Sequence, residues 1–208
     1  MKISSATRRI MRDESDLNSK RTSSAPKKKS TKGALFYFSQ FIFLFLFNLF
    51  VGDNMIKVMF ICHGNICRSP MAEFILKDMV KRRGIADDFV IASSATSTEE
   101  IWGDVGNPVY PPARRELAAH GITCGDKRAV QLRKSDYARY DYLLCMDNSN
   151  LRNAMRIIGS DKDGKLRLLL SFADGGSIAD PWYCGNFDRT YADIVKGCEG
   201  FLEYLGYK

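Results

Sequence analysis

The residues with the clearest chemical potential form a short run from Cys62 to Pro70, with the sequence CHGNICRSP. An apolar stretch precedes this run and a helical pattern follows it. A strand–loop–helix of this kind points successive backbone N–H groups inward and forms a cradle for a tetrahedral anion. Arg68 can grip two phosphate oxygens at once through its planar guanidinium. The run therefore predicts a phosphate-binding loop.

A thiol at the mouth of such a cradle has a predictable reactivity. The positive field of the loop favours the thiolate of Cys62 at neutral pH. A thiolate below a phosphoryl group attacks phosphorus in line and forms a phosphocysteine. We therefore expect Cys62 and Arg68 to be catalytic, and the other loop residues to bind phosphate or substrate. Those residues are His63, Gly64, Asn65, Ile66, Cys67 and Ser69.

Some loop residues have a more specific expected role. Gly64 should supply a backbone conformation that a side chain would forbid. Ser69 should hydrogen-bond the sulfur of Cys62 and help it to leave, and Ser69 or a neighbour should cap the following helix. Asn65 should brace the loop through Ser93, at the end of the second predicted strand. These roles make the loop a rigid support for the thiolate.

The leaving oxygen of a phosphate ester needs a proton, so a carboxylic acid should approach the rim of the cradle and later activate water. Asp180 is the best candidate, because it lies in a loop with the sequence IADPWY in which Pro181 stiffens the backbone. Trp182 and Tyr183 supply flat walls suited to a phenyl ring. The chemistry that these residues predict is hydrolysis of an aryl phosphate.

The elements that position these residues follow an alternating pattern. Strands separated by helices indicate an α/β fold, with a single domain and a doubly wound four-stranded parallel sheet covered by helices on both faces. The ligand site of such a sheet lies at the carboxyl ends of the strands, where the loop from Cys62 begins. The predicted strands are 56–61, 89–93, 141–146 and 166–170, and helices are expected from Pro70 to Gly84, at 112–120, after the third strand and at 188–204.

The positive charge of the chain is concentrated in its N-terminal part. Residues 1–54 hold 10 Lys or Arg and 4 Asp or Glu, a balance of +6, whereas residues 55–208 hold 21 and 20, a balance of +1. A nucleic-acid-binding domain would carry its own basic face. We therefore expect no nucleic-acid partner for the domain at 55–208.

The six cysteines form no repeating frame and include no C-x-x-C pair, and the chain has only two histidines. This pattern predicts reduced thiols, a cytoplasmic location and no metal site. We also expect no cofactor. Outside the loop, the cysteines are expected to serve as packing residues, and they are Cys124, Cys145, Cys184 and Cys198.

The N-terminal extension divides into two parts. Residues 1–32 form a basic segment that we expect to be disordered. Residues 33–52 carry no charge, and seven of the thirteen phenylalanines lie between positions 36 and 50. This length can span a bilayer, which would make the segment a membrane anchor. The favoured interpretation is a misassigned start, with Met55 beginning the working protein, and a processed leader is the third alternative.

Taken together, these residues resemble the low-molecular-weight protein tyrosine phosphatase family. The motif C-x-G-N-I-C-R-S-P after an N-terminal strand, with D-P-W-Y far downstream, carries the resemblance, which extends over nearly all of 56–206. It implies action on phosphotyrosine-containing proteins, with Cys62 as nucleophile and Asp180 as general acid. We expect the protein to be a monomer. It also implies that Cys67 can form a protective, reversible disulfide with Cys62.

The chain departs from the family at 102–105, which resembles an insertion beside the pocket, and at His63, a variable position. Two related enzymes remain as alternatives. A thioredoxin-coupled arsenate reductase needs two further closely spaced cysteines, but Cys124 and Cys145 are 21 residues apart. Protein arginine phosphatases carry Thr where this chain has Ile66. A non-catalytic phosphotyrosine-binding module would need neither Cys62 nor Asp180.

Overall fold

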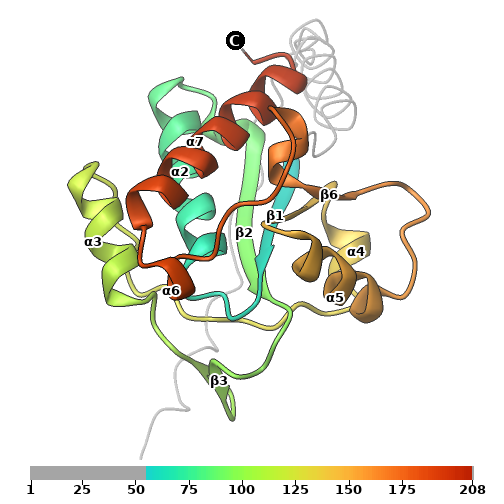
Figure 1. Ribbon diagram of the computed structural model, residues 1–208. Coiled ribbons are helices and arrows are strands. Elements are labelled where there is room, and N and C mark those ends of the chain that lie inside the picture. The colour runs from blue at the N-terminus through green and yellow to red at the C-terminus, as the bar shows by residue number, and fades with distance from the viewer. Residues whose placement is uncertain (1–54, 208) are drawn as a thin grey trace, which may run out of the picture. The chain divides into compact units, whose positions relative to one another are not determined.

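The computed structural model describes residues 55–207, so the predicted segments 1–32 and 33–52 lie outside the described residues. Within 55–207 the chain forms a parallel sheet of four strands in the order β2-β1-β5-β6. This arrangement confirms the predicted α/β fold, and Figure 1 shows the helices around the sheet. The strands are β1 (Ile56–Cys62), β2 (Phe89–Ala95), β5 (Tyr142–Cys145) and β6 (Leu166–Leu168).

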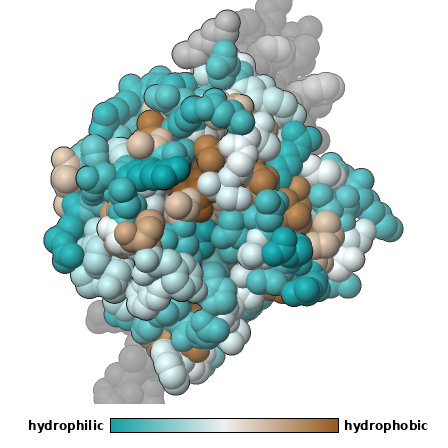
Figure 2. Space-filling view, viewed as in Figure 1, coloured by the Kyte–Doolittle hydropathy of each residue, from teal (hydrophilic) through white to brown (hydrophobic). Residues whose placement is uncertain are grey.

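Alternate residues of β1 enter two separate apolar cores, which explains why this strand is almost wholly apolar. Val58 and Phe60 belong to the core formed with α2 (Arg68–Arg82), α3 (Pro111–Ala119) and α7 (Phe187–Tyr204). Met59 and Ile61 belong to the core formed with α4 (Asp136–Arg139) and α5 (Asn148–Ile158). Helices therefore cover both faces of the sheet. The face of the molecule in Figure 2 is mainly hydrophilic, with some apolar residues near its centre.

The last predicted strand is shorter than expected. The ladder ends at Leu168, and Leu169–Phe172 forms a 3-10 turn, η2. Leu169 is fully buried against Gly197 of α7, where an added Cβ would lie 2.6 Å from the Leu169 Cγ. Leu169 therefore packs on the helix and not in the sheet. From the sequence alone, an apolar residue in this environment cannot be distinguished from a buried strand residue.

Several short elements have no counterpart in the predicted pattern. They are η1 (Ala86–Asp88), the antiparallel hairpin of β3 (Ile101–Trp102) and β4 (Val105–Gly106), α4, and α6 (Pro181–Cys184). Both the hairpin and α6 lie at the end of the molecule to which the carboxyl ends of β1 and β2 point (Figure 1). Among residues 55–207, no helix is long and apolar enough to cross a membrane.

Candidate active site

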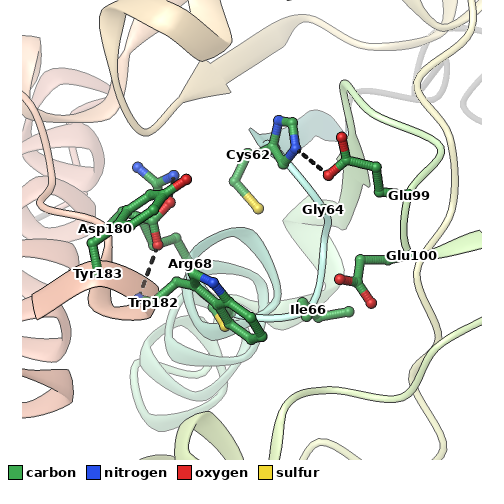
Figure 3. Close-up of a pocket in the computed structure, with 11 residues that line it drawn as sticks. Cys62, Gly64, Ile66, Arg68, Glu99, Glu100, Asp180, Trp182 and Tyr183 are labelled. Carbon is green, nitrogen blue, oxygen red and sulfur yellow. Dashed lines mark hydrogen bonds and ion pairs between the residues drawn. The ribbon is translucent and has the colours of Figure 1, made fainter. Parts of the chain in front are cut away.

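The loop after β1 forms one wall of a cavity of about 170 Å³ at the carboxyl ends of the strands. Figure 3 shows the Cys62 side chain in this cavity, with Asp180 and Tyr183 on one side and Glu99 and Glu100 on the other. Nine of the twelve predicted site residues line the cavity, namely Cys62, His63, Gly64, Ile66, Cys67, Arg68, Asp180, Trp182 and Tyr183. The other three, Asn65, Ser69 and Ser93, are buried side chains that support the loop.

The sulfur of Cys62 is held by two hydrogen-bonding groups. The backbone N–H of Asn65 points at Sγ over 3.3 Å, and the Ser69 hydroxyl lies 3.0 Å from it. Ser69 is the second residue of α2, whose N-cap is Cys67, so the prediction that Ser69 or a neighbour provides a capping side chain is wrong. The Ser69 hydroxyl turns to the sulfur instead. Both groups are able to donate a hydrogen bond to the sulfur.

Asn65, rather than Gly64, takes the unusual backbone conformation in this loop. Asn65 has φ of 57°, and its amide donates to the hydroxyls of Ser69 and Ser93, each at 2.8 Å. Its Oδ1 accepts from the Val130 N–H at 3.0 Å. Gly64 does not have a left-handed φ, and an added Cβ there would lie 2.8 Å from Glu100 Cγ. The predicted role of Gly64 is therefore wrong, because close approach and not φ limits this position.

A buried ion pair that the sequence did not reveal supports the Asn65–Ser93 contact on the side of Ser93. The Ser93 hydroxyl donates to Glu73 Oε2 at 2.6 Å, and Lys127 Nζ lies 3.0 Å from the same oxygen. Lys127 also donates to the Ser93 carbonyl at 3.2 Å. The signal in the sequence was an acid inside the apolar stripe of a helix, since Glu73 precedes Leu76 and Val80 at helical spacing.

Acid should destabilise the domain through Glu73. Burial alone would raise the pKa of this carboxyl, but Lys127, Lys77 and the Ser93 hydroxyl bring it below its ordinary value of 4.5. The unfolded chain then binds more protons between the two pKa values, so this stabilisation is present above pH 4.5 and lost as pH falls through the folded pKa. We expect the free energy of unfolding, measured with urea, to fall more steeply with decreasing pH for the wild type than for Glu73→Gln. The exposed Glu203→Gln should keep the wild-type slope, and parallel curves for wild type and Glu73→Gln would contradict the assignment.

Arg68 is buried and fixed by three acceptors at the base of the cavity. Its guanidinium donates to Asp147 Oδ2 at 2.6 Å, to the Ile178 carbonyl at 3.2 Å and to Asp180. Burial alone would lower the pKa of Arg68, but the charges of Cys62, Asp180 and Asp147 raise it. Asp147 was missed as a site residue, although it lies two residues after the end of β5, at the edge of the sheet where ligands bind.

Asp180 has two partners that fix its carboxylate at the rim. One oxygen pairs with Arg68, and the other accepts from the Trp182 N–H at 3.1 Å, so Asp180 is the N-cap of α6. The predicted loop at this position is therefore a short helix. Trp182 is 56% exposed and Tyr183 is 88% exposed, so both are surface walls of the cavity and not core residues.

The other cysteines differ strongly in their surroundings. Burial and the neighbouring Cys62 raise the pKa of Cys67 to about 12, so Cys67 is a neutral thiol at physiological pH. All the cysteines are free thiols, and the disulfide of Cys67 with Cys62 stays a prediction. Cys124, Cys145 and Cys198 are buried as expected, but Cys184 is exposed at the end of α6, so its predicted packing role is wrong.

Two acids on the opposite rim were also missed. Glu99 Oε2 pairs with His63 Nε2 at 2.8 Å, and Glu100 Oε2 accepts from Asn107 Nδ2 at 2.7 Å. Both follow β2 and line the cavity. Their sequence signal was weak, because paired acids in a loop are common at any protein surface.

Comparisons with known proteins agree with this geometry. Residues 57–208 match the family model for low molecular weight phosphotyrosine protein phosphatase. The pig protein of that name is 42% identical over 71% of this chain and 94% of its own length. The crystal structure of YfkJ from Bacillus subtilis has a TM-score of 0.66 and 31% identity over 73% of this chain and 95% of its own. That of the drosophila arginine phosphatase DARP has a TM-score of 0.64 and 30% identity over 72% of this chain and 98% of its own. The chain is therefore a phosphatase that belongs to the low molecular weight phosphotyrosine protein phosphatase family.

Proposed function

We propose that the protein hydrolyses phosphotyrosine with Cys62 as nucleophile, Arg68 as phosphate clamp and Asp180 as general acid. The observation that carries this proposal is the position of the Cys62 sulfur, between the Asn65 amide and the Ser69 hydroxyl in a cavity that Asp180 borders. A thiolate held there can react in line with phosphorus while the amides and Arg68 hold the phosphate oxygens.

The reaction proceeds in two displacements. The Cys62 thiolate forms an S–P bond as the P–O bond to tyrosine breaks, and Asp180 gives its proton to the departing phenolate. Asp180 then takes a proton from a water molecule that attacks phosphorus, and the S–P bond breaks to release phosphate. The Ser69 hydroxyl, 3.0 Å from the sulfur, stabilises the returning thiolate.

The ion pair between Arg68 and Asp180 fits this cycle. Phosphate oxygens need the same guanidinium N–H groups that Asp180 occupies. An arriving phosphate therefore replaces Asp180 on Arg68, and the freed carboxyl can carry the proton that the phenolate requires. Asp147 keeps the guanidinium in place during this exchange, because it pairs with the other terminal nitrogen.

Two rival reactions have weaker support. Ile66 presents an apolar side chain to the cavity, which favours a phenyl ring over the charged guanidinium of phosphoarginine. An arsenate reductase would need a relay of accessible thiols. Cys124 and Cys145 are both buried, and Cys145 ends β5.

One set of assays tests the proposed function. The protein should hydrolyse phenyl phosphate and phosphotyrosine in the presence of a chelator, and it should not reduce arsenate with thioredoxin as electron donor. Phosphoarginine should be a poorer substrate than phosphotyrosine by at least an order of magnitude. Loss of activity with chelator, or faster turnover of phosphoarginine, would overturn the proposal.

We also propose that the substrate is a phosphotyrosine-containing protein and that the enzyme is a cytoplasmic monomer without cofactor or metal. The balance of +1 over 55–208 supports a protein rather than a nucleic-acid partner. A buried neutral thiol at Cys67 beside Cys62 suits a reducing compartment. Membrane attachment would require that 33–52 is a genuine anchor.

A further inference from the structure

The segment 98–106, which we term the acidic arm, is unusually charged for a wall of a phosphate site. It carries Glu99, Glu100 and Asp104, and it has no Lys, Arg or His. The arm leaves the end of β2 and includes the β3–β4 hairpin. Figure 3 shows Glu99 and Glu100 across the cavity from Asp180 and Tyr183.

Local contacts hold the arm in place. The Asn107 N–H donates to the Glu100 carbonyl at 2.8 Å, and the Asn107 side chain donates to the Glu100 carboxylate at 2.7 Å. The Ser97 N–H donates to the His63 carbonyl at 2.9 Å, and Glu99 pairs with the His63 ring. The two carboxylates are therefore fixed beside the loop that binds phosphate.

This charge opposes the group that the site must bind. Arg68 is the only Lys or Arg among the cavity-lining residues, and the carboxylates of Glu99, Glu100 and Asp180 line the same cavity. Asp180 acts in the reaction, but Glu99 and Glu100 have no role in it and repel a phosphate dianion. A substrate that brings its own positive charge to this rim converts the repulsion into attraction.

The tip of the arm offers a surface for such a substrate. Trp102 is 73% exposed and Val105 is 60% exposed, and Asp104 lies between them. An exposed tryptophan beside a carboxylate suits the side chain of Arg or Lys, because the ring packs on the aliphatic stem and attracts the cation.

We propose that the acidic arm selects phosphotyrosine sites that have Lys or Arg residues close to the phosphotyrosine. This inference rests on the proposed function and names the substrate class of the same site. Glu99 and Glu100 bind the basic side chain nearest to the phosphotyrosine, and Trp102 with Asp104 binds one further along the peptide.

The test compares three phosphotyrosine peptides of equal length with basic, neutral or acidic flanks. At low ionic strength, kcat/KM should be about tenfold higher for the basic than for the acidic peptide, because several exposed ion pairs each contribute modestly. The ratio should fall as salt rises. Glu99→Gln and Asp104→Asn should each lower the ratio, and Trp102→Ala should reduce kcat/KM for the basic peptide alone.

Asp163→Asn is the matched control, since this carboxylate is exposed and outside the arm, and the ratio should not change. Phenyl phosphate has no flanks, so Asp104→Asn and Trp102→Ala should hydrolyse it at the wild-type rate. Failure to hydrolyse phenyl phosphate at all would overturn the proposed function. Normal hydrolysis with equal kcat/KM for the three peptides would overturn the selectivity alone.

Discussion

A Cys62→Ser variant is expected to lose hydrolysis of phenyl phosphate by at least about 10⁴-fold, as removal of a nucleophile does in other covalent enzymes. The Ser69 hydroxyl and the Asn65 N–H around this position can stabilise an anion. They do not provide a base that could remove a proton from serine. The variant should still bind inorganic phosphate, because Arg68 and the loop amides are unchanged, and titration calorimetry measures this binding directly.

Cys184→Ser is the matched control for this substitution. Its thiol is exposed and donates only to the Asp180 carbonyl, a contact that serine can reproduce. Its activity should equal that of the wild type. Activity of Cys62→Ser within tenfold of the wild type would place the nucleophile elsewhere. Loss of phosphate binding would mean that the loop itself had collapsed.

The parts of the site that could be predicted are formed by residues that are close together in the sequence. Cys62, Arg68 and the residues between them are contiguous, and a strand–loop–helix is enough to arrange them around an anion. The strands could also be predicted, because β1 is buried on both faces and its apolar run has few alternatives. Asp180 could be proposed because the Pro-Trp-Tyr sequence after it indicates a stiff segment with aromatic walls at the rim of the cavity.

The parts that could not be predicted depend on contacts between distant segments. Glu73 and Lys127 meet only because α2 is rotated to turn Glu73 toward β2, where Ser93 lies between them. Asp147 reaches Arg68 only because β5 lies next to β1 in the sheet. The pairing of strands is not encoded in the local pattern of either one. The close approach at Gly64 likewise depends on Glu100, which comes from another loop.

An Asp180→Asn variant is expected to lower kcat/KM for phenyl phosphate by about 10²–10³-fold, within the usual range for a general acid. The amide oxygen can still accept from the Trp182 N–H, so the cap of α6 is retained. What is lost is the proton for the departing oxygen. The effect should shrink for p-nitrophenyl phosphate, because its leaving group departs as a stable anion without help. Because kcat/KM reports only the steps up to phenol release, slower hydrolysis of the phosphocysteine does not obscure the comparison.

Asp147→Asn separates proton donation from support of Arg68. Asp147 pairs with the same guanidinium as Asp180, so the same substitution removes a similar ion pair. Asp147, however, also caps α5 by accepting from the Asn150 N–H at 2.7 Å, which an Asn oxygen can reproduce. We expect Asp147→Asn to weaken binding of the phosphoryl group. It should therefore lower kcat/KM by the same factor for every aryl phosphate, whatever its leaving group. If the loss of kcat/KM depends on the leaving group in Asp180→Asn but not in Asp147→Asn, Asp180 is the proton donor. If the loss is the same for every leaving group in both variants, Asp180 acts only by holding Arg68.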